Sequence, residues 1–232
     1  MSAGKKWLFD TWSIYDRVLD RNYMFHREIY GAVETFLRTE LGGKPIRVLD
    51  LGCGSARHIA EVLRGHEVSE YVGYDLSEAA LAHAQDSLAK LDCAVTLCCA
   101  SLMDSLQHEE ASFDLIFAGY ALHHLPAQMK EIFSAGARGK LTRSGILALV
   151  DVVRDPAEDR DAWARNYCAW LRSDWNEFKP EEKDWMCDHI STSDFPWSDV
   201  ELETLAKRAG FCETNSLMRL PWHGAWVMLN DE

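Results

Sequence analysis

The sequence predicts an α/β fold with a doubly wound sheet of seven strands, mostly parallel but with an antiparallel last strand. Between residues 46 and 153, five short apolar segments alternate with segments of helical periodicity, which is typical of a parallel sheet covered on both faces. The turn after the first of these segments is rich in glycine. Near the C-terminus, two strand-like segments are joined by PWHG, which predicts an antiparallel pair that closes the sheet.

The elements follow in order from residue 46. The first strand, Ile46–Leu51, is a continuous apolar run, and residues 56–63 carry apolar side chains at helical spacing. Ser77 caps a later helix, with acidic Glu78 in its first turn. The remaining elements of this series are expected at residues 71–74 (strand), 77–91 (helix), 94–99 (strand), 113–120 (strand), 127–140 (helix) and 145–153 (strand).

Segments on both sides of this series complete a single predicted domain. A block of helices from Trp7 to about residue 41 precedes the first strand, and we expect it to lie over the carboxyl edge of the sheet. A helix capped by Ser198 and ended by Gly210 precedes the last two strands. We divide the chain into a helical lid (1–44), a ligand-binding core (45–153), an acidic, tryptophan-rich helical insertion (154–197), and the last helix with the closing strand pair (198–232).

Composition excludes several classes of protein. The 232 residues are 47% hydrophobic, so the chain can bury a core without disulfides or metal. The net charge of -13 disfavours a nucleic-acid partner. No segment resembles a signal peptide or a membrane span. Seven cysteines without a C-x-x-C pair predict neither a disulfide framework nor a zinc site. We expect a cytoplasmic monomer or homodimer with no metal ligands.

The stretch DLGCGSARH places an acid, Asp50, before its glycines. In an open parallel sheet, ligands bind beyond the carboxyl ends of the strands, where glycines let the backbone approach them. Asp50 would repel the pyrophosphate of a dinucleotide but attract a ligand with positive charge. S-adenosylmethionine has an ammonium, a sulfonium and no phosphate. The third glycine of a dinucleotide fingerprint would fall on Arg57, so a nicotinamide-dependent dehydrogenase is the weaker alternative.

Three segments carry a family resemblance. VLDLGCGSARH resembles the first motif of the class I S-adenosylmethionine-dependent methyltransferases of small-molecule type, YVGYDLS their acidic second motif, and FDLIFAGYALHHL their fourth-strand motif with its loop. The resemblance covers about residues 15–153 in motif detail and the closing strands in pattern only. Ala56 departs from it, because the family often has glycine there. The resemblance implies a Rossmann-like fold and S-adenosyl-L-methionine as cofactor.

The resemblance also implies cofactor-binding residues. Asp50 is expected near the cofactor's ammonium, and Asp75, at the end of the second strand, is expected to accept both ribose hydroxyls. Ser101 stands where many members have an acid that accepts from the adenine amino group. Tyr15 resembles a lid tyrosine, with packing on a helix face as its alternative, and Arg27 either pairs with a carboxylate or is solvated. The expected set is Tyr15, Tyr23, His26, Arg27, Asp50, Gly52, Cys53, Gly54, Asp75, Leu76, Ser101, Leu102, Ala118 and His123.

Three residues are candidates for catalysis. Methyl transfer from a sulfonium is an in-line displacement that needs positioning, desolvation and, for some acceptors, a base. Tyr120 is expected beside the sulfonium, and His124 is a candidate base whose alternative is a structural or cofactor-facing role. His189 could reach over the pocket from the insertion; its alternative is a surface or helix-end position.

The acceptor is less visible in the sequence. Five of the nine tryptophans fall between residues 163 and 197, and they form either core or an aromatic pocket that receives a cation. We expect a small substrate that bears an amine or a carboxylate. The same motifs would also suit an enzyme that directs an amine onto the cofactor's methionine side chain and releases methylthioadenosine. A non-catalytic binding module is the third alternative.

Overall fold

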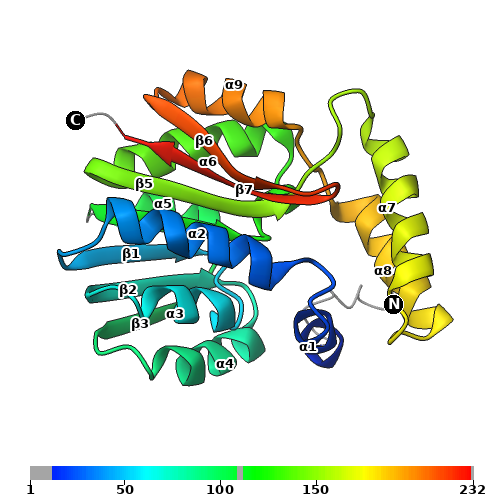
Figure 1. Ribbon diagram of the computed structural model, residues 1–232, viewed down its shortest axis with the longest axis horizontal. Coiled ribbons are helices and arrows are strands. Elements are labelled where there is room, and N and C mark those ends of the chain that lie inside the picture. Colours follow the sequence, from blue (N-terminus) through cyan, green and yellow to red (C-terminus); the bar gives the residue numbers. More distant parts are fainter. Residues whose placement is uncertain (1–11, 109–111, 231–232) are drawn as a thin grey trace.

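The computed structural model describes residues 12–108 and 112–230, which form one seven-stranded sheet flanked by helices (Figure 1). The strand order is β3-β2-β1-β4-β5-β7-β6, in which β7 runs antiparallel to both of its neighbours and β1 to β5 are parallel. The predicted fold class is therefore confirmed. The strands are β1 (Ile46–Leu51), β2 (Val68–Asp75), β3 (Ala94–Cys99), β4 (Phe113–Gly119), β5 (Leu141–Val152), β6 (Glu213–Arg219) and β7 (His223–Leu229).

Helices cover both faces of the sheet and its carboxyl edge. Those on the faces are α2 (His26–Glu40), α3 (Arg57–Leu63), α4 (Glu78–Leu88), α5 (Leu102–His108), α6 (Ala127–Lys140) and α9 (Asp199–Ala209). Beyond the carboxyl ends of the strands lie α1 (Trp12–Asp20), α7 (Arg160–Asp174) and α8 (Pro180–Ser193) (Figure 1). None of the helices in the described part of the chain has the length and apolar content that crossing a membrane requires.

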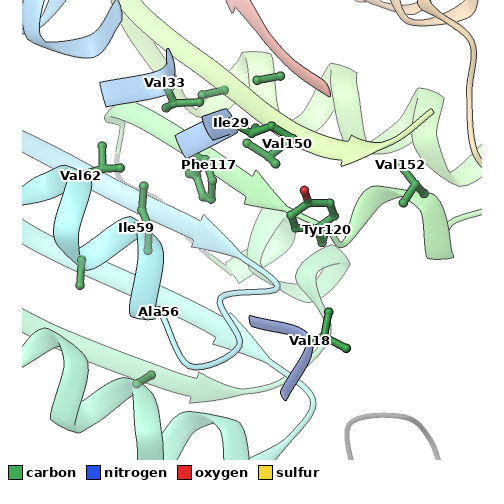
Figure 2. Packing of buried hydrophobic residues seen from close by; sticks show 14 of the residues in the cluster. Val18, Ile29, Val33, Ala56, Ile59, Val62, Phe117, Tyr120, Val150 and Val152 are labelled. Atoms are coloured by element: carbon green, nitrogen blue, oxygen red, sulfur yellow. The ribbon is translucent and has the colours of Figure 1, made fainter. Parts of the chain in front are cut away.

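The alternation of side chains along β1 explains the two cores. Ile46 and Val48 pack in the cluster with α2 and α3, whereas Leu49 and Leu51 pack in the cluster with α6 and α9 on the other face. Figure 2 shows the first cluster, in which side chains of α2 and α3 meet strand residues of β4 and β5. Because side chains alternate, Asp50 points to the same face as Ile46 and Val48, toward the N-terminal helices.

The N-terminal block lies only partly where the sequence predicts it. Helix α1 lies beyond the carboxyl edge, as expected, but α2 packs on the face of the sheet against α3, β6 and β7 (Figure 1). The reason is an apolar face on α2, whose buried residues Ile29, Val33 and Leu37 contact the first core cluster. Trp7 and the rest of the block before residue 12 lie outside the described residues.

Several boundaries differ from the predicted ones. Helix α5 is not predicted at all: it is a single short segment, and Ser101 caps it by accepting from Met103 N at 3.1 Å. Strand β2 begins at Val68, earlier than predicted, because Val68 pairs with Ile46. Strand β5 begins at Leu141, directly after α6. Local hydrophobicity misses both extensions, since pairing with a neighbouring strand defines them.

The helical insertion is a pair of packed helices. Asp159 caps α7 by accepting from Ala162 N at 2.7 Å, and Pro180 occupies the first turn of α8. The apolar side chains Trp163, Tyr167 and Leu171 of α7 are buried in the first core cluster, and Trp170 packs against it partly buried. These aromatic side chains therefore act as core, which is one of the two alternatives that the sequence leaves open.

Candidate active site

One cavity of about 700 Å³ opens at the carboxyl edge of the sheet. The strand order reverses there, because β2 pairs with one side of β1 and β4 with the other, and such a switch point is where open α/β sheets bind ligands. Its walls are formed by the turns after β1, β2 and β4, by helices α1 and α2, and by Thr192, Ser193 and Phe195. Of the predicted site residues, those that line it are Tyr15, His26, Asp50, Gly52, Cys53, Gly54, Asp75, Leu76, Ser101, Leu102, Tyr120 and His124.

The glycine-rich turn brings backbone to the cavity wall. Gly52 has φ of 79°, and a Cβ there would lie 2.6 Å from the Cβ of Ala121. The backbone N–H groups of Gly52 and Cys53 both donate to Tyr74 O, at 2.8 and 2.9 Å, which ties this turn to the end of β2. Only glycine satisfies both the conformation and the close approach.

We expect Gly52→Ala to lower the free energy of unfolding by about 2–4 kcal/mol, because a left-handed alanine and an overpacked contact are both unfavourable. Urea denaturation measures the change. Gly31→Ala is the matched control, since Gly31 lies inside α2 and a Cβ there would meet no atom within 4 Å. That control should be neutral or stabilising by up to about 1 kcal/mol. Equal stability of Gly52→Ala and wild type would contradict the prediction.

Asp50 presents one uncommitted carboxylate oxygen in a buried position. Its Oδ2 accepts from the hydroxyl of Tyr71 at 2.5 Å, whereas Oδ1 has no hydrogen-bond partner among the described residues. Asp50 is only 1% exposed. Burial raises its pKa to about 7, the Tyr71 hydroxyl partly opposes this, and Asp75 adds to it. This carboxylate is therefore suited to a cationic ligand group.

Asp75 is held rigidly by backbone donors. Its Oδ2 accepts from Gly54 N at 2.9 Å, and its Oδ1 accepts from Ser77 N at 2.8 Å. Burial raises the pKa of this carboxyl, and the backbone hydrogen bonds oppose the rise. Each carboxylate oxygen keeps a second lone pair, so the group can accept further hydroxyl donors from the cavity.

The wall next to Asp75 combines an apolar surface with polar backbone. Leu76 is 76% exposed and lines the cavity, which is unusual for a leucine. Ser101 and Leu102, at the start of α5, also line the cavity. The Ser101 hydroxyl already accepts from Met103 N, and its oxygen retains one further acceptor site.

The lid contributes neutral aromatic and imidazole side chains. His26 is 1% exposed, and neither of its ring nitrogens has a hydrogen-bond partner among the described residues. Its ring centroid lies 4.7 Å from Tyr120 and 4.8 Å from His58. Burial, with His58, His223 and Arg57 nearby, lowers the pKa of His26 well below its usual range. A neutral imidazole thus faces the cavity.

Tyr120 and Tyr15 also line the cavity. Tyr120 has φ of 54°, a conformation that a bulky residue rarely adopts, and its hydroxyl donates to Met24 O at 2.5 Å. This bond connects the end of β4 to the lid. Burial raises the pKa of Tyr15, and Asp75 and Asp16 contribute to the rise, so its phenol is neutral.

Two predicted lid residues are not among those that line the cavity. The hydroxyl of Tyr23 accepts from Glu177 N at 3.1 Å, and its ring stacks on Trp175 with centroids 4.9 Å apart. Tyr23 therefore joins the lid to the insertion. Arg27 is exposed, and its guanidinium donates to Asp20 O at 3.1 Å. Its position agrees with the solvated alternative.

Ala118 is also absent from the cavity wall. Its neighbours on β4, Phe117 and Gly119, line the cavity. Since consecutive side chains of a strand point to opposite faces, Ala118 packs into the second core cluster. The sequence motif locates the strand end correctly, but the side chain of Ala118 lies on the other face.

The predicted histidines gather around a buried carboxylate. His124 lines the cavity, and its Nδ1 lies 3.3 Å from Asp194 Oδ1. His189 Nε2 lies 3.6 Å from the same oxygen. His123 is buried and hydrogen-bonds through Nδ1 to Asp151. Burial alone would lower the pKa of His123, but the carboxylates of Asp151 and Asp194 outweigh it and raise the pKa. His123 and His189 are not among the lining residues.

Sequence reasoning missed several lining residues. Tyr30 lies one helical turn after His26 on α2, so their spacing places both on one face, and this signal was available. His58, in the first turn of α3, follows the glycine-rich turn directly. Phe195 and Ser193 reach the wall from the end of the insertion, and no sequence pattern indicates this. None of the tryptophans in the described part of the chain is among the lining residues, so the predicted aromatic pocket is not found in this cavity.

The chain matches a known family over part of its length. The family described as "Methyltransferase domain" matches residues 48–145, which run from β1 into β5 and include the glycine-rich turn and Asp75. No curated protein matches the chain.

Solved structures share the fold. The chain is similar to the cyclopropane synthase MmaA2 from Mycobacterium tuberculosis (21% identity, 80% of this chain and 62% of that chain covered, TM-score 0.56). It is also similar to an O-methyltransferase family protein from Burkholderia thailandensis (15% identity, 80% of this chain and 51% of that chain covered, TM-score 0.60). A third similar structure is that of the plantazolicin methyltransferase BpumL in complex with a triazolic desmethylPZN analog and SAH (14% identity, 97% of this chain and 96% of that chain covered, TM-score 0.66). The chain spans between half and two thirds of the length of the first two.

Proposed function

We propose that this chain, which carries a class I S-adenosylmethionine-dependent methyltransferase domain, transfers a methyl group to a small-molecule acceptor. The observation that carries the proposal is the composition of one cavity at the switch point of the sheet. A close-approach glycine turn, the uncommitted Oδ1 of Asp50 and the rigidly held carboxylate of Asp75 all line it. Its volume of about 700 Å³ is within the range of small-molecule sites.

The residues present fit S-adenosylmethionine. When bound, the cofactor supplies a methyl group on a positively charged sulfonium. Asp50 would accept from the ammonium of its methionine portion, and Asp75 would accept from the ribose hydroxyls. The exposed face of Leu76 would pack on the adenine, with Ser101 and the backbone N–H of Leu102 at its edge. Gly52 lets the turn pack closely against Ala121, because a Cβ there would lie 2.6 Å from the Cβ of Ala121.

The charged side chains of the cavity wall that are not assigned to the cofactor favour a carboxylate-bearing acceptor over an amine. Among the described lining residues, Asp50 and Asp75 are the only carboxylates, and both are assigned to the cofactor. Arg57 also lines the cavity, with its guanidinium 2.8 Å from Asp20 and half exposed. An arginine can bind a carboxylate through two parallel hydrogen bonds. No further acid of the described wall remains to bind a cationic amine.

His26 supports a role in proton transfer. Neither ring nitrogen has a hydrogen-bond partner among the described residues, the side chain lines the cavity, and its ring contacts Tyr120 at the end of β4. A neutral imidazole can accept the proton that a hydroxyl group of such an acceptor loses as it is methylated. The lid thus excludes water and places a base at the cavity, while the sheet edge holds the cofactor.

Mass spectrometry of the nucleoside products tests the proposed function. The purified protein is incubated with S-adenosylmethionine alone and with a small-metabolite extract or a panel of carboxylic acids. Formation of S-adenosylhomocysteine only when acceptors are present is the expected result, and the methylated acceptor appears in the same spectra. Methylthioadenosine formed from the cofactor alone would overturn methyl transfer in favour of attack on the methionine side chain.

Binding of S-adenosylhomocysteine should strengthen by about tenfold between pH 6 and pH 8. The pKa of Asp50 is about 7 in the free protein, so most of the carboxyl is protonated at pH 6 and ionised at pH 8. The ligand's ammonium binds the ionised form, and binding below pH 7 must therefore release a proton. Calorimetry in buffers of different ionisation enthalpy measures both effects. In Asp50→Asn, affinity should be lower and independent of pH over this range; a pH dependence that persists would assign it to another group.

A further inference from the structure

Three imidazoles surround one buried carboxylate where the insertion meets the core. Asp194 follows α8, and its Oδ1 lies 3.3 Å from His124 Nδ1, 3.6 Å from His189 Nε2 and 3.9 Å from His123 Nε2. His123 and His124 belong to the 3₁₀ turn Leu122–His124 after β4, and His189 belongs to α8. Potential ligand atoms from two distant segments of the chain thus meet at one oxygen.

Asp151 determines which nitrogen of His123 faces Asp194. The Nδ1 of His123 hydrogen-bonds to Asp151, which also accepts from Val152 N at 2.8 Å. A neutral His123 therefore donates from Nδ1 and presents the lone pair of Nε2 on the side of Asp194. The carboxylates of Asp151 and Asp194 favour a positive charge between Nε2 and Asp194, which either a proton on Nε2 or a metal ion supplies. Carboxylate–imidazole pairs of this kind orient histidine ligands in metal sites.

The ammonium of the buried Lys130 does not bind the carboxylates of this cluster. Lys130 is buried, but its ammonium donates to Phe195 O and lies 4.9 Å from the ring centroid of Trp197. It does not form an ion pair with Asp194 or Asp151 within 4.0 Å in the described structure. The two carboxylates and three imidazoles therefore provide an electron-rich, mainly nitrogen and oxygen donor set.

We propose that His123, His124 and Asp194 bind a divalent transition-metal ion of the zinc type. Their ligand atoms all lie within 4.8 Å of one another. Bonds of about 2.0–2.1 Å to a tetrahedral zinc ion place neighbouring ligand atoms about 3.3 Å apart. The 3.3 Å from Asp194 to His124 matches this spacing, and the 3.9 Å from Asp194 to His123 must shorten when the ion binds. Two imidazoles and one carboxylate are a common ligand set for such ions.

The proposed metal site borders the cavity. His124 lines it, and so do Ser193 and Phe195 on either side of Asp194. Three protein ligands leave a coordination position for an oxygen or nitrogen of a small molecule. The site would also connect the insertion to the end of β4. Metal binding goes beyond the proposed methyl transfer and does not depend on the cofactor.

Zinc binding tests the site directly. The full chain is stripped with a chelator, titrated with Zn²⁺ and desalted, and the retained metal is counted by mass spectrometry. We expect one ion per chain and a rise in Tm of about 5–10 °C when free zinc is about 100-fold above Kd. A chain that retains less than about 0.1 ion and shows no change in Tm would overturn the proposal, and a proton would then bridge the carboxylate and imidazoles.

Variants separate a metal site from a hydrogen-bond network. His124→Gln and Asp194→Asn should weaken zinc binding at least about 100-fold, and Asp151→Asn about 10- to 100-fold through His123. His66→Gln is the matched control, because His66 lies between α3 and β2 at the opposite edge of the sheet. If Asp194→Asn does not fold, the zinc affinity of His124→Gln alone decides whether the metal site exists. Wild-type zinc affinity in His124→Gln would contradict the site. S-adenosylhomocysteine binding is measured separately, so failure of the metal site leaves the proposed function intact.

Discussion

Asp75→Ala is expected to raise the Kd for S-adenosylhomocysteine at least about 100-fold. Hydrogen bonds to a charged acceptor contribute about 1.5–3 kcal/mol each, and two ribose hydroxyls lose theirs together. The substitution also removes the acceptor for Gly54 N and Ser77 N, so the turn that faces the ligand loses its anchor. Isothermal titration calorimetry measures the affinity, and circular dichroism verifies that the variant is folded.

Two further variants control this experiment. Asp75→Asn keeps one oxygen acceptor of the same shape, so its loss of affinity should be smaller than that of Asp75→Ala. Asp86→Ala removes an exposed carboxylate from α4 and should leave affinity unchanged. Affinity within threefold of wild type in Asp75→Ala would show that this carboxylate does not bind the ribose.

His26→Phe is expected to lower kcat by about 10²- to 10⁴-fold, the usual contribution of a general base. Phenylalanine preserves a ring that packs against Tyr120 and His58 but has no nitrogen to accept a proton. Because the change removes an interaction with the reacting acceptor, Kd for S-adenosylhomocysteine should change less than threefold. Steady-state kinetics with the acceptor identified by mass spectrometry gives kcat, and calorimetry gives Kd.

The pattern of effects distinguishes proton transfer from cofactor binding at His26. A loss of affinity with unchanged kcat would instead support the cofactor-binding role that the resemblance implies. His66→Phe, at the amino edge of the sheet, controls for general effects of replacing a histidine and should preserve both quantities. A fall in kcat of less than threefold in His26→Phe would exclude a base at this position.

Much of the fold was predictable because its signals are local. Ser77 and Ser198 cap helices as expected, by accepting from Ala80 N at 3.2 Å and Glu201 N at 3.4 Å. Gly210 ends α9 in the left-handed conformation. Strand β1 and helix α6 have the predicted bounds. Each of these features depends on residues close together in the chain, so composition and spacing are sufficient.

The sequence by itself determined the sheet edge of the candidate site. Asp50, the glycine turn and Asp75 follow strand ends, and parallel strands that leave a sheet on one side must bring those ends together. Tertiary structure decided which other residues join the candidate site. Tyr30 faces the cavity because α2 packs on the sheet, whereas Tyr23, in the turn before α2, contacts the insertion. The meeting of His124 with Asp194 depends on where α8 ends. Such contacts join distant segments through packing, which local sequence does not encode.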